Sequence, residues 1–370
     1  MLNEYFESQK DKLSYLELKI PLELGGQRIE TEKVPLPIET EKLLSHIQNS
    51  KNNENISLAF FLRGMMINFA IHQDFSYQKN YREIIYAWSE KPEEWFFKNA
   101  LQNLGKDEAL LMFRGLFYFN PDFMINRIFY AKALFMKAFQ FSEDKHSEWI
   151  EESIAILEKT LDVDENNIMT LSTLGDIFST TGFYSKADVY YQKALKQNPE
   201  MLFAEEIRKK RLDMEKDLAL EKSRLEMDTG RYEEALETLL NALKNKRDAE
   251  LCYWVGVCYQ GLGSLEESIP FFEETLEKIP NHLEATNDLC ISLYLLGKID
   301  SALRILGEAI RRYPKDARLK YNLMVLLYQN ENPKRGNELL HELLHMKEKG
   351  EIEYPDIIEA VEQFNYEMQK

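Results

Sequence analysis

A regular spacing of small residues in the second half of the chain constrains its fold more than any other feature. The intervals are seven, five, seven and five residues, first at Gly175, Gly182, Ala187, Ala194 and Pro199. They return at Gly256, Gly263, Ser268, Thr275 and Pro280, and then, 34 residues further on, at Cys290, Gly297, Ala302, Ala309 and Pro314. A period of this length indicates one supersecondary unit stacked several times.

Each period has room for two helices of about a dozen residues. In the first clear copy, a turn is expected at Thr181 and Gly182. Small side chains at Gly175, Ala187 and Ala194 would let the two helices approach closely. A proline ends the second helix because it lacks the N–H that the helical ladder needs.

Weaker copies of the pattern lie beside the clear ones. Residues 216–248 carry its second half, and residues 317–350 form a last copy with Met324 and Gly336 in the small-residue positions. The pattern resembles the tetratricopeptide repeat family, whose unit is a 34-residue helix–turn–helix. Large residues also stand where this family has them, at Phe178, Tyr184, Tyr232 and Tyr259. The resemblance implies an all-α superhelical (solenoid) array that binds peptides and is not an enzyme.

The N-terminal part departs from the repeat pattern. Residues 15–36 alternate apolar and polar side chains around Gly25-Gly26, which predicts a β-hairpin. In the aromatic region that follows, helices over residues 56–69 and 77–88 are expected to pair. The predicted organisation is a hairpin segment at 1–50, divergent aromatic-rich repeats at 54–167, a repeat array at 168–350 with a helical insert at 202–215, and a capping helix at 351–370.

The composition limits the classes of partner. The net charge of −17 argues against nucleic acid and against an anionic membrane surface, because both require an excess of Lys and Arg. The three cysteines, Cys252, Cys258 and Cys290, include no close pair, so we expect buried, reduced thiols. The N-terminal residues show no secretory pattern. We therefore expect a cytoplasmic protein.

One short stretch, HELLH at residues 341–345, spells the H-E-x-x-H pattern of zinc peptidases. A peptidase would need His341 and His345 in a cleft, Glu342 as general base and a third ligand, for which Glu359 or Glu362 is available. On a helical wheel, however, both histidines point away from the leucine face, toward solvent. A zinc metallopeptidase is kept as the alternative function. No phosphate-binding loop, dinucleotide fingerprint or nucleophile elbow occurs, so neither a catalytic residue nor a cofactor is predicted.

In the family that this chain resembles, the first helices of successive repeats line a concave groove. Carrying that arrangement over, residue by residue, predicts a strip rich in tyrosine and aliphatic residues, which suits an interface. The expected groove residues are Leu220, Arg224, Met227, Tyr253, Val257, Asn287, Ile291, Tyr294, Arg318, Tyr321, Val325 and Tyr328.

The predicted function is a non-catalytic scaffold or adaptor whose partner has apolar or aromatic residues and basic flanks. Some family members clamp the carboxylate at the end of a chaperone tail, but Asp288 stands at the centre of the matching positions and would repel it. Three questions stay open from the sequence: whether the N-terminal hairpin regulates binding, whether the N-terminal repeats carry the main site, and whether the chain forms a homo-oligomer.

Overall fold

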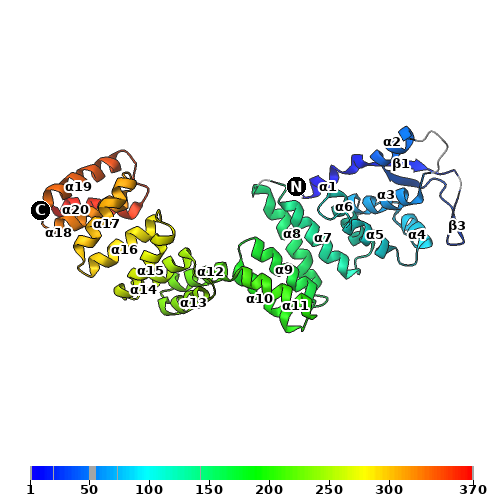
Figure 1. Cartoon of the computed structure of the whole chain (residues 1–370). Coiled ribbons are helices and arrows are strands. Elements are labelled where there is room, and N and C mark those ends of the chain that lie inside the picture. The colour runs from blue at the N-terminus through cyan, green and yellow to red at the C-terminus, as the bar shows by residue number, and fades with distance from the viewer. Residues whose placement is uncertain (1, 20, 50–55, 73, 142, 369–370) are drawn as a thin grey trace. The chain divides into compact units, whose positions relative to one another are not determined.

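A computed structural model describes residues 2–19, 21–49, 56–72, 74–141 and 143–368 of this chain (Figure 1). These residues form a succession of helices, with short strands near the N-terminal end. Packing divides the chain into two units, Met1–Lys209 and Lys210–Lys370. The all-α class with a small N-terminal hairpin is confirmed.

The predicted hairpin is formed by β2 (Leu22–Leu24) and β3 (Gln27–Ile29), which pair antiparallel. Its turn residues, Gly25 and Gly26, have positive φ angles of 56° and 76°. Glycine adopts this backbone conformation without steric cost, as a two-residue hairpin turn requires.

A second antiparallel pair, β1 (Leu13–Glu17) with β4 (Pro35–Glu39), contains the outer residues of the predicted hairpin segment and extends a few residues beyond them. Two prolines in β4 would normally count against a strand, but each strand of a two-stranded ribbon has a free edge where no N–H is needed. Leu36 and Ile38 of β4 are fully buried, and β4 packs on α3 (Leu58–Ile71) (Figure 1).

The first unit contains a core rich in aromatic side chains. Its further helices are α1 (Leu2–Glu7), the short 3-10 helix Lys10–Lys12, α2 (Thr40–Asn49), α4 (Gln78–Trp88), α5 (Pro92–Leu101), α6 (Asp107–Phe119), α7 (Met124–Ala138) and α8 (Glu143–Leu161). The expected pairing of residues 56–69 with 77–88 is wrong, because α3 packs mainly against α6. Gly115 permits this, since it brings α6 against the backbone of Met66.

The first clear repeat forms α9 (Ile168–Thr180) and α10 (Tyr184–Lys196), which pack against each other. A Cβ atom added to Gly175 would lie 2.6 Å from the ring of Tyr191. The expected close approach at the small-residue position is therefore confirmed.

The second unit consists of helix pairs in chain order. The pairs are α12 (Glu215–Asp228) with α13 (Tyr232–Asn245), α14 (Ala249–Gly261) with α15 (Leu265–Lys278), α16 (Leu283–Leu295) with α17 (Ile299–Arg312), and α18 (Ala317–Gln329) with α19 (Pro333–Glu348). The last helix, α20 (Pro355–Met368), packs on α18 and α19. Before them, the expected insert forms a separate helix, α11 (Met201–Asp213), which crosses the boundary between the units.

The turn inside each repeat explains one position of the sequence pattern. Gly182, Gly230, Gly263 and Gly297 have φ between 72° and 82°. In the last repeat, Glu331 occupies the same position with a φ of 52°. A residue with a side chain adopts this conformation at an energetic cost. The last repeat thus forms the same turn without glycine, and the absence of this glycine is one reason why the last copy matches the sequence pattern less well.

Candidate functional site

All twelve residues of the predicted groove lie on the first helices of the repeats in the second unit, α12, α14, α16 and α18. Successive first helices, α14, α16 and α18, contact one another. Their predicted groove residues are half-buried: Tyr253, Val257, Asn287, Ile291, Tyr294, Arg318, Tyr321, Val325 and Tyr328. Eight of the nine are tyrosine, valine, isoleucine or asparagine side chains that keep part of their surface accessible, as a binding strip requires.

The three predicted residues of α12 differ from one another. Leu220 is only 5% exposed and lies in a core cluster with helices α13 and α14, so it offers no binding surface. Met227 is half-buried, with its sulfur 3.5 Å from the Cys258 thiol. Arg224 is exposed, and its guanidinium lies 5.2 Å from the ring centre of Trp254. Trp254 is not among the residues predicted from the sequence, although it is adjacent to Tyr253.

A ladder of hydrogen bonds connects the first helices. The Tyr253 hydroxyl on α14 donates to Asp288 Oδ2 on α16 over 2.9 Å. Asn322 Nδ2 on α18 donates to Asn287 Oδ1 over 2.5 Å. Gln260 Nε2 on α14 donates to Ser292 Oγ over 2.9 Å. Part of the predicted strip therefore also holds neighbouring repeats in register.

The carboxylate of Asp288 is the most unusual charged group on this strip. Burial raises its pKa above the ordinary value, although Tyr253 and Asn287 donate hydrogen bonds to it. Desolvation disfavours the charged form of a carboxyl group, so a cation placed beside Asp288 would be stabilised there.

The nearest predicted groove cation, Arg318, already has acidic neighbours. Its Nη2 atom lies 3.4 Å from Asp316 and 3.6 Å from Glu284, and its guanidinium stacks 4.2 Å from the ring centre of Tyr354. Together with Asp288, these groups make the α16–α18 end of the strip net acidic. This charge opposes binding of a peptide carboxylate and supports the rejection of a chaperone-tail clamp.

The HELLH stretch lies on α19 with both histidines on the solvent side. His341 and His345 are exposed. Glu342 Oε2 lies 2.8 Å from the ammonium of Lys320, a residue of α18 that is only 9% exposed. Of the two candidate third ligands, Glu362 pairs with Lys347. In the described part of the chain, no three His, Cys, Asp or Glu side chains are placed to hold one metal ion. The glutamate thus acts as the partner of a buried lysine.

Removing metal is expected to leave the protein unchanged. Protein purified without chelator should contain far less than one zinc per chain, and His345→Ala should unfold at the wild-type temperature, because its imidazole is exposed and pairs only weakly with Glu348. Elemental analysis and thermal unfolding with and without chelator measure both. Stoichiometric zinc that is lost in His345→Ala would contradict this reading.

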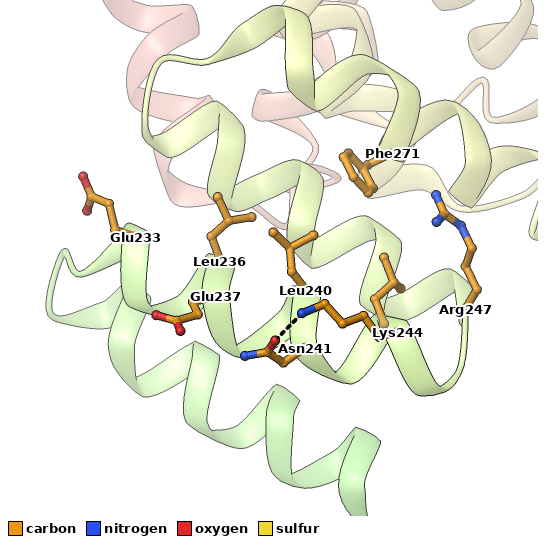
Figure 2. A pocket seen from close by; sticks show the side chains of 9 residues that line it. Glu233, Leu236, Glu237, Leu240, Asn241, Lys244, Arg247 and Phe271 are labelled. Atoms are coloured by element: carbon orange, nitrogen blue, oxygen red, sulfur yellow. Dashed lines mark hydrogen bonds between the residues drawn. The ribbon is translucent and has the colours of Figure 1, made fainter.

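A pocket of about 560 Å³ lies between the second helices α13 and α15 (Figure 2). Leu236, Leu240 and Phe271 provide its apolar surface, and Glu233, Glu237 and Lys244 are charged residues along it. The family resemblance predicts binding on the first helices, whereas this pocket lies on the second helices and was not predicted.

Comparisons with known proteins identify the repeats. Three family models, each described as tetratricopeptide repeat, match residues 170–201, 220–282 and 259–324. No curated protein matches the chain. Within the described residues, none of the helices is long and apolar enough to cross a bilayer.

Several solved structures are similar to parts of the chain. MamA 41-end from Desulfovibrio magneticus RS-1 is 26% identical, over 36% of this chain and 75% of that one, with a TM-score of 0.34. PilW, a type IV pilus biogenesis factor, is 14% identical over 62% and 97%, with a TM-score of 0.40. YrrB, a TPR protein with an unusual peptide-binding site, is 17% identical over 67% and 96%, with a TM-score of 0.27. All three TM-scores are below 0.5, so the repeats are identified by the family matches alone.

Proposed function

We propose, from the premise that this chain is a tetratricopeptide repeat protein over residues 170–201 and 220–324, that it is a non-catalytic scaffold. Its strip of first-helix residues, from Arg224 to Tyr328, would bind a segment of a partner protein. Proteins of this repeat architecture use extended concave surfaces for such binding.

The observation that supports this proposal best is the mixture of half-buried tyrosines and acidic groups on one strip. Tyr294 and Tyr321 offer apolar area at low rotamer cost, with a hydroxyl group for hydrogen bonding. The partly desolvated carboxylate of Asp288 favours a nearby cation. A partner segment with apolar or aromatic residues flanked by Lys or Arg fits both features.

We also propose the cytoplasm as the compartment. Cys252, Cys258 and Cys290 are free and buried, and burial raises the pKa of the Cys252 thiol to about 11 and those of Cys258 and Cys290 to about 12. Thiols with such pKa values stay protonated and inert, as expected of structural cysteines in a reducing compartment.

The strip is tested by a pull-down from native lysate with three folded baits. Wild type should capture a partner that Tyr294→Ala with Tyr321→Ala loses by about tenfold or more, because two interface tyrosines are removed. The matched control is Leu225→Ala with Leu295→Ala, which changes two exposed side chains of α12 and α16 outside the strip. It should capture the partner like wild type.

Equal capture by all three baits would place the binding site elsewhere, and attention would move to the aromatic N-terminal repeats and the hairpin. If the tyrosine variant does lose the partner, Asp288→Asn should weaken the binding of a partner with basic flanks. The affinity of that variant should also depend less steeply on salt concentration.

A further inference from the structure

A second pocket, of about 380 Å³, lies in the first unit, where α1, the end of α3 and α6 meet. Phe6 and Ile71, which are 2% and 6% exposed, give it an apolar wall. Its polar lining consists of Asn3, Glu7, His72, Asp74 and Arg114. This pocket shares no residue with the first-helix strip or with the pocket between α13 and α15.

Arg114 of α6 is a buried cation without an anionic partner. It is only 4% exposed, and no described Asp or Glu pairs with it. Its Nε donates to the carbonyl oxygen of Ala70 over 2.8 Å, and its Nη1 donates to the Tyr130 hydroxyl over 2.9 Å, so both acceptors are neutral. The guanidinium also stacks on the Phe6 ring, 3.7 Å from the ring centre.

The Nη2 atom of Arg114 is the part of this side chain left for a ligand. It makes no hydrogen bond with a described residue, yet it is not sealed from solvent, and the pocket is the space that opens onto it. A buried charge costs free energy unless an opposite charge compensates it. The C-terminal end of α3, beside Ala70, supplies only a partial negative charge. A bound carboxylate would complete the compensation through a charge-assisted hydrogen bond.

The acidic residues of the pocket add a second requirement. Glu7 already pairs with Lys10, and burial lowers the pKa of His72, so its imidazole is neutral at pH 7. Asp74 is exposed and forms no ion pair with a described residue. It would repel a ligand that carries only a carboxylate. A ligand that also carries an ammonium is attracted by both Arg114 and Asp74.

We propose that this pocket binds a free α-amino acid with an apolar side chain. The carboxylate accepts a hydrogen bond from Arg114 Nη2, the ammonium lies toward Asp74 at the exposed edge, and the side chain packs on Phe6 and Ile71. An apolar wall with a few polar groups is the usual composition of a small-molecule pocket. The site is independent of the proposed scaffold function, which uses the second unit.

Isothermal titration calorimetry of the full chain with L-leucine, L-methionine and L-phenylalanine tests the proposal. At least one of the three should bind. Two analogues of that amino acid serve as ligand controls, one without the ammonium and one without the carboxylate. Each should bind at least about fivefold more weakly, because it loses one of the two charged contacts.

Asp74→Asn is the main variant, because the side chain is exposed and its replacement leaves the packing intact. It should weaken binding of the amino acid by about fivefold. The matched control is Asp122→Asn, an exposed aspartate of the same unit outside the pocket lining, and it should bind like wild type. Arg114→Lys, shown by circular dichroism to be folded, should bind at least about tenfold more weakly, because the ammonium of lysine is too short to replace Nη2.

The outcomes that overturn the proposal are distinct. Absence of binding by all three amino acids is the first. The second is equal binding of the analogue without the ammonium, because the pocket would then take anions in general. The third is an affinity that Asp74→Asn leaves unchanged, or that Asp122→Asn lowers to the same extent.

Discussion

Gly115→Ala is expected to destabilise the N-terminal unit by about 3 kcal/mol. A Cβ atom there would lie 1.9 Å from the carbonyl oxygen of Met66 and 2.8 Å from its carbonyl carbon. Both atoms belong to the backbone of α3, so no rotamer change relieves the overlap, and α3 and α6 have to separate. Buried side chains of the two helices, among them Leu62 and Phe113, would then lose packing contacts.

Urea unfolding followed by tryptophan fluorescence measures this loss, since Trp88, Trp95 and Trp149 all lie in the N-terminal unit. The matched control is Gly307→Ala on α17 of the C-terminal unit, where an added Cβ meets nothing within 4 Å, and its unfolding is followed by circular dichroism. That variant should be more stable by about 0.5–1 kcal/mol, because alanine loses less conformational freedom in a helix. A Gly115→Ala protein as stable as wild type would contradict the close packing of α3 on α6.

Phe272→Ala is expected to destabilise the C-terminal unit by about 3–5 kcal/mol. The ring is fully buried and fills the space that Gly256 leaves on α14, where an added Cβ would lie 2.6 Å from ring atom Cε1. Gly256→Ala should for the same reason cost about 1–3 kcal/mol, since the ring has to move out of its place.

The pair can be tested as a double-mutant cycle. Phe272→Leu removes the ring atoms that an added Cβ at position 256 would overlap. The double variant should therefore lose about 1 kcal/mol less stability than the two single variants lose together. Urea unfolding followed by circular dichroism gives the four free energies. Strictly additive losses in the free energy of unfolding would show that Gly256 and the Phe272 ring do not pack against each other.

The repeat architecture was predictable because its determinants are local. Positions such as Gly175 and Gly256 recur with the period of the repeat, and each lies against an aromatic ring of the paired helix. The hairpin was predictable for a similar reason, since Gly25 and Gly26 are two adjacent residues that favour a tight turn. In both cases, residues close in sequence decide the structure.

The N-terminal unit was harder to predict because its contacts join distant segments. The β1–β4 ribbon joins strands about twenty residues apart, and β4 carries prolines that sequence rules count against a strand. The contact between α3 and α6 joins helices that are separated in the sequence by two others, α4 and α5. The α3–α6 pairing leaves no periodic signal in the sequence.

The candidate site shows the same division. The sequence placed Tyr294 and Tyr321 on first helices, where the structure has them half-buried, but it also selected Leu220, which the core covers. Helical periodicity states which face a side chain occupies. Which neighbouring helix covers that face depends on packing.

By itself, the sequence determined the repeat period, the helix pairs, the glycine turns and the acidic charge of this protein, since each is set by residues within one repeat or by composition. Only the tertiary structure decided that Glu342 pairs with Lys320, that Tyr253 donates a hydrogen bond to Asp288, and that α13 and α15 leave a pocket between them. The physical reason is that these features arise where side chains of different helices meet, and those distances depend on how the helices pack.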